Sequence, residues 1–313
     1  MKKLLLVLVT AMSTVAVHAI DDSTVEVVYD GATATVTVAD NIASDVVVNS
    51  GSSSHVVITS NTESVEIVYS LSGTSDDGEF CLNGVYKCGI DLNGLTLTNP
   101  AGPALNIQNG KRIEISAKKG TTNTLVDSKS NELNGCIYCT GHLEFKGKGT
   151  LNVTGKSKHA IYSMEYTSLK NLTLNITGAK KDGIHCKEYF LMESGTLAIC
   201  NTGDDGIQCE LAGESSTGEI TSHKDEDSGN VYQEDGTLTI KDYGGKAIKS
   251  DGTIYYRGGN QEFDTSDTTT GIISVKSSRV CVNAAIYDLN GRRMSNSNIT
   301  HGVYIQNGKK IVK

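Results

Sequence analysis

After residue 20, apolar residues alternate with polar ones over short segments that end in Gly, Asn or Asp. This period of two, interrupted by turn-forming residues, predicts short β-strands joined by tight turns. No part of that region keeps the apolar spacing of an amphipathic helix. Four segments share one pattern: GTLNVTGKSKHAIYS from Gly149, NLTLNITGAKKDGIHC from Asn171, GTLAICNTGDDGIQC from Gly195 and GTLTIKDYGGKAIKS from Gly236.

The repeated segments keep a fixed distance along the chain. Two apolar columns recur every 23 residues, with one step of 41: Leu151, Leu174, Leu197 and Leu238, and Ile161, Ile184, Ile207 and Ile248. The longer step predicts an insertion at about residues 211–230. A period of 23 residues with two or three strands matches one coil of a β-solenoid, whereas a propeller blade needs ~40–45 residues. We therefore predict an all-β fold, a single-stranded parallel β-helix over residues 20–262.

The strand alternation also predicts which side chains face outward. Because Ile184 and Cys186 are expected in the core, His185 between them is expected to face solvent. The same spacing predicts an outward row of polar and aromatic groups that a linear polymer can lie along. Candidate carbohydrate-binding residues are Tyr138, Tyr162, Tyr166, His185, Glu188, Tyr189, Gln208 and Lys249. The alternative is an ordinary solvated face.

Acidic turns precede two members of the isoleucine column. Asp182 and Asp205 are one repeat apart, and Asp204 lies beside the second. Stacked carboxylates repel one another, and carboxylate oxygens suit Ca²⁺, so we expect a Ca²⁺ site there. The alternative is that Asp-Gly only forms tight turns. Asp225 and Asp227 in the insertion are weaker metal candidates.

The N-terminus predicts export. Lys2 and Lys3 precede an apolar run too short to span a bilayer, and small residues follow up to Ala19. We expect a signal peptide over residues 1–19, no transmembrane segment and a secreted protein. Cys81 and Cys88 flank an Asn-Gly turn, which predicts a disulfide; two buried thiols are the alternative.

Charge narrows the class of partner. The 28 basic and 36 acidic residues give a net charge of −8, and loss of the two signal-peptide lysines leaves −10. This balance argues against nucleic acid as a partner, because nucleic-acid backbones are bound by clustered Lys and Arg. We expect the chain to act as a monomer.

Several motifs resemble a known family. The segments LNGLTLTNPAGPALNIQNGKRIEI, GHLEFKGKGTLNVTG, DGIHC and GDDGIQ are similar to the secreted bacterial carbohydrate-binding β-helix family, over residues 24–260. The resemblance implies a right-handed parallel β-helix like that of pectate lyases. It also implies binding of plant cell-wall polysaccharides, including acidic chains and β-glucans. The Ca²⁺ of that family maps onto Asp182, Asp204 and Asp205.

The C-terminus resembles a second family. AAIYDLNGRR from Ala284 and HGVYIQNGKKIVK from His301 are similar to the type IX secretion sorting domain. The resemblance implies a small β module at 279–313, export machinery as a partner, and a destination outside or on the surface of a gram-negative bacterium. DTSDTTTG predicts a linker over residues 263–278.

Three function classes follow from these features. We favour a Ca²⁺-assisted carbohydrate-binding protein with no catalytic residues. A Ca²⁺-dependent, pectate-type polysaccharide lyase is the first alternative, for which Lys181, Lys187 and Lys249 are candidate bases. A structural or adhesin solenoid that binds no glycan is the second alternative.

Overall fold

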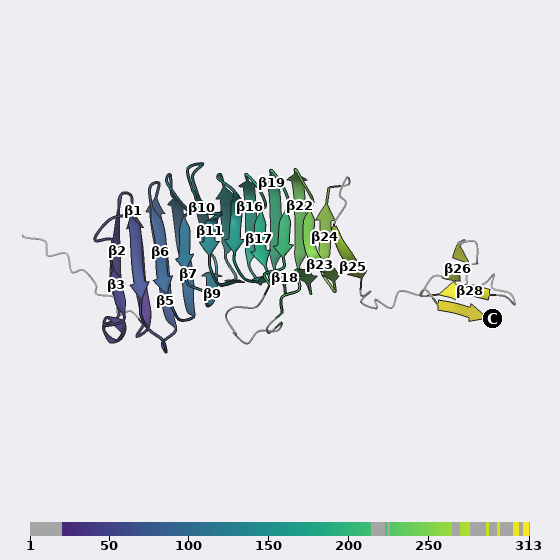
Figure 1. The fold of residues 1–313 in the computed structure, drawn as a ribbon, viewed down its shortest axis with the longest axis horizontal. Coiled ribbons are helices and arrows are strands. Elements are labelled where there is room, and N and C mark those ends of the chain that lie inside the picture. Colours follow the sequence, from purple (N-terminus) through teal and green to yellow (C-terminus); the bar gives the residue numbers. More distant parts are fainter. Residues whose placement is uncertain are drawn as a thin grey trace, which may run out of the picture. The chain divides into compact units, whose positions relative to one another are not determined.

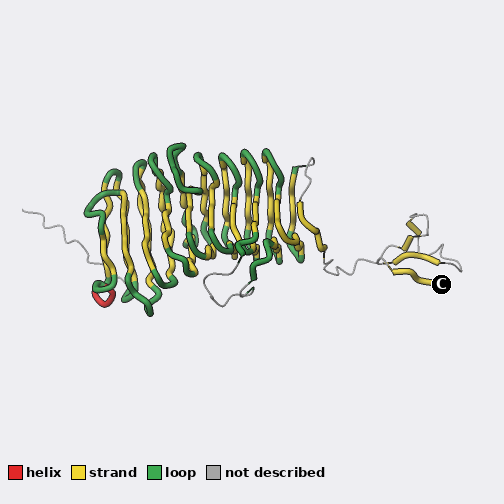
Figure 2. The backbone as a smooth tube through the Cα atoms, in the orientation of Figure 1, coloured by secondary structure: helices red, strands yellow, loops and turns green. Residues whose placement is uncertain are grey.

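The computed structural model describes residues 21–213, 223, 226–264, 270–275, 286–287, 293–294, 303–306 and 309–312. The predicted signal peptide and Asp225 lie outside these residues. The chain divides into two compact units, Met1–Val275 and Lys276–Lys313. Strands β1–β25 of the first unit form one mostly parallel sheet, and only a single turn of 3₁₀ helix, η1 (Asp40–Ile42), interrupts the described strands and loops. Figures 1 and 2 show the strands of successive coils side by side, with the coils following one another in chain order. This confirms the all-β, mostly parallel prediction.

Strands one repeat apart pair in parallel and form three columns. The first consists of β4 (His55–Ser60), β6 (Glu79–Gly84), β8 (Leu105–Gln108), β11 (Gly135–Cys139), β14 (His159–Ser163), β17 (Ile184–Lys187), β20 (Ile207–Glu210) and the start of β23 (Ile248–Tyr256). The second consists of the starts of β5 (Ile67–Ser75) and β7 (Cys88–Thr98), then β9 (Arg112–Ala117), β12 (His142–Gly147), β15 (Thr167–Lys170), β18 (Tyr189–Met192), β21 (Asn230–Gln233), the end of β23 and β25 (Thr270–Val275). The third consists of the ends of β5 and β7, then β10 (Thr122–Val126), β13 (Thr150–Gly155), β16 (Thr173–Ala179), β19 (Thr196–Thr202), β22 (Thr237–Tyr243) and β24 (Asn260–Phe263).

Antiparallel strands cover the N-terminal end of the columns. β1 (Thr24–Asp30) pairs in parallel with β5 and antiparallel with β2 (Thr33–Val38). β3 (Val46–Val48) pairs antiparallel with β4. A solenoid end otherwise exposes an unpaired strand edge and an open core, so these strands protect both.

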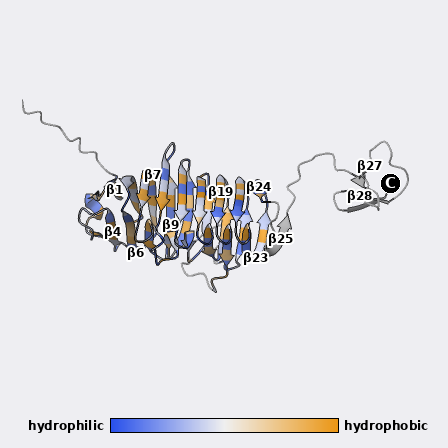
Figure 3. Cartoon of the chain, turned by 90° about the horizontal axis from the view of Figure 1, so that it is seen from above, coloured by the Kyte–Doolittle hydropathy of each residue, from blue (hydrophilic) through white to orange (hydrophobic). Residues whose placement is uncertain are grey.

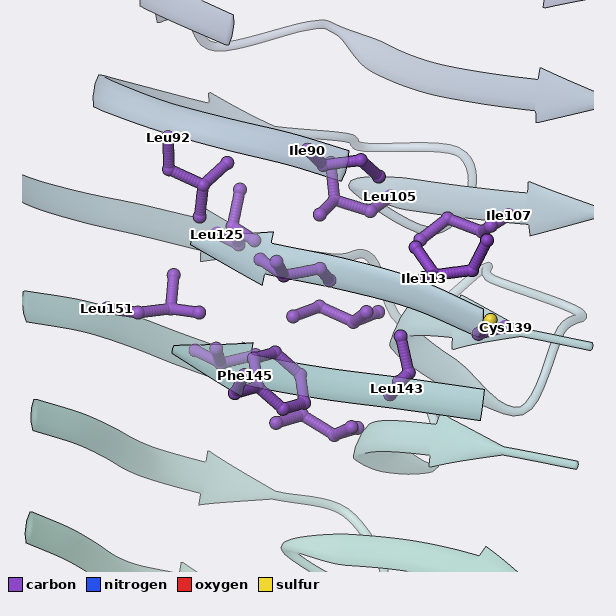
Figure 4. Packing of buried hydrophobic residues seen from close by; sticks show 14 of the residues in the cluster. Ile90, Leu92, Leu105, Ile107, Ile113, Leu125, Cys139, Leu143, Phe145 and Leu151 are labelled. Carbon is purple, nitrogen blue, oxygen red and sulfur yellow. The ribbon is translucent and has the colours of Figure 1, made fainter. Parts of the chain in front are cut away.

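The predicted apolar columns coincide with the observed register. Leu151 pairs with Leu174, and Leu197 with Leu238; Ile184 pairs with Ile207. Both of these isoleucines are fully buried. Figure 3 shows the alternation of hydrophobic and hydrophilic positions along the strands, and Figure 4 shows apolar side chains from successive strands filling the space between them. One continuous core therefore runs along the first unit.

Two predictions fail in this part of the structure. Cys81 and Cys88 are both free, because Cys88 points into the core while Cys81 lies between the buried Phe80 and Leu82 and so faces outward. The predicted linker contains a strand, since β25 pairs with β23 and adds to the second column. The linker prediction followed from composition alone, which does not register this pairing.

The second unit is a small antiparallel sheet. It contains β26 (Ile286–Tyr287), β27 (Arg293–Met294), β28 (Val303–Gln306) and β29 (Lys309–Val312). β26 pairs with β27 and β28, and β28 pairs with β29. These strands fall within the range predicted as a C-terminal β module.

Candidate functional site

A ladder of tyrosines lies outside the main core, along the second column. Tyr166 and Tyr189 stack with ring centroids 4.7 Å apart, and Tyr232 and Tyr255 stack at 5.0 Å. Their spacing follows the strand register, because Tyr232 pairs with Tyr255 in neighbouring strands. Tyr166, Tyr189 and Tyr232, together with Leu191, form a buried cluster of their own. The ring faces are therefore occupied by stacking between tyrosines, whereas the ring edges and hydroxyl groups can contact other groups.

A cavity of about 600 Å³ lies against this ladder. Its lining combines aromatic, apolar and charged side chains: Glu144, Tyr166, Ser168, Lys170, Tyr189, Leu191, Glu193, His223, Glu234 and Arg257. Such a mixture of apolar surface with a few convergent polar groups is typical of small-molecule sites. The lining comes from several coils, so the repeat itself brings these residues together.

The charges in the cavity are largely balanced within it. Lys170 lies 2.5 Å from Glu193, and Arg257 lies 2.6 Å from Glu234. The Arg257 guanidinium also lies 4.9 Å from the ring centre of Tyr232 and 5.1 Å from that of Tyr255, within cation–π range. Among the described residues of the lining, Lys170 and Arg257 thus each have a carboxylate partner, and Glu144 adds a further carboxylate, which makes this part of the site slightly acidic.

The Tyr166 hydroxyl donates a hydrogen bond to Glu144 at 2.6 Å. Burial, and then the nearby Glu144 carboxylate, raises the pKa of Tyr166. Burial and a hydrogen bond to Glu226 likewise raise the pKa of Tyr232. The hydroxyls of Tyr166 and Tyr232 consequently stay protonated at neutral pH and act as hydrogen-bond donors.

The segment between β20 and β21 contributes one side chain to the cavity. His223 stacks on Tyr232 at 4.4 Å between ring centres and lies 5.0 Å from the ring of Tyr189. Glu226 links His223 to the ladder: its carboxylate contacts His223 at 2.5 Å and accepts a hydrogen bond from the Tyr232 hydroxyl at 2.5 Å, with further hydrogen bonds from Ser228 and Asn230. Burial alone would raise the pKa of Glu226, but these hydrogen bonds outweigh it and lower the pKa to about 2.

The Glu226→Gln variant is expected to lose stability in a pH-dependent way. A carboxylate whose pKa is depressed in the folded state stabilises the protein above its unfolded pKa of ~4.3, and this contribution disappears as pH falls through the folded value. We expect a loss of ~1 kcal/mol at pH 7, because the group is partly exposed and its interactions are screened by solvent. Urea denaturation at pH 7 and at pH 2.5 measures the loss of stability and its dependence on pH. Glu262→Gln, a change at an exposed carboxylate, is the control. An equal loss of stability for Glu226→Gln at the two pH values would contradict a lowered pKa of Glu226 in the folded protein.

The first column carries a second ladder, which includes the predicted outward row. Tyr138 stacks on Tyr162 at 5.6 Å, and Tyr162 stacks on His185 at 5.2 Å. The register brings these residues together with Gln208 and Lys249, as predicted. Tyr162 and His185 are nevertheless only 8 % exposed. The expectation of an open row of ring faces is wrong for these two, because each ring is covered by its neighbours.

Three more predicted binding residues are buried at the bend between the two columns. Glu188 is 1 % exposed, and its carboxylate accepts hydrogen bonds from the Tyr166 backbone N–H and from His142. Tyr166 and Tyr189 are 2 % and 1 % exposed, although both line the cavity. Glu188 therefore supports the tyrosine ladder from below and does not face a ligand.

The structure brings the three predicted metal ligands together. One carboxylate oxygen from each of Asp182, Asp204 and Asp205 lies within 4.8 Å of the others. The Asp205 Oδ2 atom is buried and accepts no hydrogen bond, and Lys249 Nζ lies 3.6 Å from it. Burial, with the neighbouring carboxylates adding to it, raises the pKa of Asp205.

The acidic turn fits Ca²⁺ through Asp204 and Asp205 better than through Asp182. A side chain at Gly245 would place its Cβ 2.4 Å from Asp205 Oδ1 and 2.6 Å from Asp204 Oδ1, so the glycine leaves room beside both carboxylates. Asp182 Oδ1 already accepts a hydrogen bond from the Asp205 backbone N–H at 3.1 Å, and Oδ2 lies 2.9 Å from His185 Nδ1. Ca²⁺ needs six to eight oxygen ligands, of which this turn supplies a part.

The remaining predicted residues lie away from the cavity lining. Asp227 accepts hydrogen bonds from the backbone N–H groups of Ala212 and Gly213. Both of its carboxylate oxygens are thus engaged by the backbone, which argues against a role as a metal ligand. Lys181 is exposed and Lys187 is half-buried. Of the three candidate lyase bases, Lys249 has its ammonium group 3.6 Å from the Asp205 carboxylate of the acidic turn.

Comparison with known proteins identifies the family. A family model of carbohydrate-binding domain-containing proteins matches residues 50–309 of the 313. The chain belongs to this carbohydrate-binding family. Among solved structures, it is similar to a polysaccharide lyase-like protein from C. thermocellum, solved as a gadolinium derivative, with a TM-score of 0.62 and 21% identity over 82% of this chain and 98% of that one. That likeness shows a shared fold. No curated protein matches the chain.

Membership of the carbohydrate-binding family directs attention to the cavity beside the tyrosine ladder. Sequence reasoning found Tyr166 and Tyr189 but missed Glu144, His223, Glu234 and Arg257. The sequence did contain one indication of the tyrosine ladder. Tyr232 and Tyr255 are 23 residues apart, which is the spacing of the leucine and isoleucine columns. Among the described residues, no helix is long and apolar enough to cross a bilayer.

Proposed function

We propose that this member of the carbohydrate-binding family is a right-handed parallel β-helix that binds a neutral plant cell-wall-type polysaccharide, such as a β-glucan, in the cavity beside the tyrosine ladder. The parallel pairing of strands one repeat apart supports the β-helix. The observation that carries the choice of ligand is the pairing of Lys170 with Glu193 and of Arg257 with Glu234. A uronate chain needs an unpaired cation, and the described Lys and Arg side chains of the cavity lining are both paired with carboxylates.

The cavity offers what a neutral sugar chain needs. Carboxylates such as Glu144 and Glu234 accept hydrogen bonds from sugar hydroxyls, and charge-assisted hydrogen bonds are stronger than neutral ones. Leu191 and the tyrosine edges supply apolar surface for the C–H faces of the sugar rings. Because the ladder is fixed by mutual stacking, little side-chain entropy is lost on binding.

A second candidate function is Ca²⁺-assisted binding of an acidic chain at the acidic turn. The convergence of Asp182, Asp204 and Asp205, and the buried Asp205 Oδ2 that accepts no hydrogen bond, favour it. Ca²⁺ at this turn would neutralise the carboxylates and supply positive charge for a uronate group. Asp204 and Asp205 are the residues that we expect to hold it.

Affinity electrophoresis of the full chain in gels that contain β-glucan or polygalacturonate distinguishes the candidates. We expect retardation by β-glucan that EDTA leaves unchanged. Retardation by polygalacturonate alone, abolished by EDTA and by Asp205→Asn, would replace the neutral-glycan proposal with the Ca²⁺-assisted one. Retardation by neither polymer would contradict both and support the structural solenoid. A rise in near-ultraviolet absorbance on incubation with polygalacturonate would indicate a lyase.

We further propose that the protein is exported and reaches the cell surface or the medium. The basic, apolar and small-residue pattern of residues 1–19 and the sorting-domain motifs at 279–313 support this proposal. Mass spectrometry of the protein from its native host is expected to find residues 1–19 removed. An intact Met1–Ala19 segment in the mature protein would contradict export.

A further inference from the structure

Two histidines flank the buried carboxylate of Asp182. His159 Nδ1 lies 3.1 Å and His185 Nδ1 lies 2.9 Å from Asp182 Oδ2. All three residues are buried, with exposures of 7 %, 8 % and 1 % for His159, His185 and Asp182. One ligand atom of each lies within 4.8 Å of the others. The repeat creates this arrangement, because His159 and Asp182 occupy equivalent turns one coil apart.

No single protonation state of His159 Nδ1 makes both of its contacts favourable. The ring nitrogen His159 Nδ1 faces the Asp182 backbone N–H at 3.3 Å and the Asp182 Oδ2 atom at 3.1 Å. If Nδ1 carries a proton, it opposes the backbone N–H; if it does not, its lone pair opposes the carboxylate oxygen. A cation bound by Nδ1 and Oδ2 relieves the repulsion between these two atoms, and it takes the Nδ1 lone pair in place of the Asp182 backbone N–H.

Metal binding requires Nδ1 of each histidine without a proton and the Asp182 carboxyl group ionised, because these are the states in which such groups ligate metal ions.

A carboxylate outside the cluster orients one of the histidines. Glu210 Oε2 lies 3.4 Å from His185 Nε2, the ring nitrogen that points away from Asp182. A proton on His185 Nε2 can be donated to Glu210, and Nδ1 then keeps its lone pair for a metal ion. Carboxylate partners of this kind accompany most metal-binding histidines, because they fix the tautomer and raise the basicity of the ligand.

We propose that His159, Asp182 and His185 bind a divalent transition-metal ion of the zinc type, with Glu210 as a positioning residue. Ligand atoms at ~2.0–2.1 Å from a tetrahedral ion lie ~3.3 Å apart, close to the 2.9 and 3.1 Å observed here. Two nitrogens and one oxygen suit Zn²⁺, whereas Ca²⁺ selects oxygen ligands. Three protein ligands leave the fourth position to water. This site uses Asp182 Oδ2 and is distinct from the acidic turn, which adjoins Asp182 Oδ1.

Metal titration of the full chain, freed of metal by chelation, tests the proposal. We expect Co²⁺ to give visible absorption bands of a tetrahedral site, Zn²⁺ to displace it, and calorimetry to give one Zn²⁺ per chain. His159→Gln and His185→Gln are each expected to weaken Zn²⁺ binding at least 10-fold. Glu210→Gln is expected to weaken it by about 10-fold, the effect typical of such partners.

Control variants make the outcomes decisive. His55→Gln changes a histidine that contacts the carboxylates of Asp77 and Glu79 elsewhere, and Asp204→Asn changes the acidic turn; both are expected to bind Zn²⁺ as the unmodified chain does. His142→Gln tests the neighbouring cluster with Glu165 and Glu188. Absence of Zn²⁺ binding, or loss confined to His142→Gln, overturns the proposal. If the buried histidine variants fail to fold, the Glu210→Gln variant provides the test, because Glu210 is half-exposed. An unchanged Zn²⁺ affinity in Glu210→Gln would then overturn the proposal.

Discussion

The Ile184→Asp variant is expected to lose about 3–5 kcal/mol of unfolding free energy, because it places a carboxylate without a partner in the core. Ile184 is fully buried and pairs with Ile207 of the next coil. On either side of it along the column lie apolar side chains, and no described cation reaches this position in the core. Such a loss is large against the 5–15 kcal/mol stability of a typical domain.

Urea denaturation measures the loss, and a matched variant separates burial from charge. Ala198→Asp introduces the same carboxylate at a half-buried strand position between the core residues Leu197 and Ile199, facing away from the core. We expect Ala198→Asp to change the unfolding free energy by about 0.5 kcal/mol or less, as for most surface-facing changes. Similar midpoints for the two variants would mean that the register of the first column is wrong.

The register was predictable because it depends on a one-dimensional pattern. Each coil buries the same apolar positions, so the leucine and isoleucine columns follow from counting along the chain. The positions of Leu151, Leu174 and Leu197, and of the acidic turns, follow for the same reason. Period-two alternation also predicted that the fold is all-β.

Side-chain exposure was not predictable from alternation. Alternation says that His185 leaves the main core, but it does not say that the imidazole turns onto Asp182 and is covered by Tyr162. The same holds for Tyr166 and Tyr189, whose rings face away from the main core yet bury one another. Outward residues in equivalent positions of neighbouring coils lie close enough to stack, and stacking removes them from solvent.

The cavity was missed because it depends on segments that break the repeat. His223 comes from the insertion between β20 and β21, and Arg257 follows β23, a strand that serves two columns. Neither has an equivalent in the four matched segments. Their contacts with the tyrosine ladder follow from three-dimensional packing, which counting along the chain does not provide.

The Ser168→Trp variant is expected to lose at least 10-fold in affinity for a β-glucan, which corresponds to ~1.4 kcal/mol. Ser168 lines the cavity and lies in register with Glu144 and Leu191 of the neighbouring coils. The indole fills space that the sugar chain needs, while the contacts of the tyrosine ladder stay intact. Filling the cavity therefore tests its role without removing any residue that supports the fold.

Isothermal titration of the chain with a soluble β-glucan, comparing Ser168→Trp with Ser72→Trp, tests the central claim most directly. Ser72 is a half-buried residue of β5 and does not line the cavity. Both variants are expected to unfold at the temperature of the unmodified chain. The cavity account predicts that Ser72→Trp keeps full affinity and that Ser168→Trp loses it. Equal affinity in the two variants, in a chain that binds the polymer, would contradict the cavity as the carbohydrate-binding site.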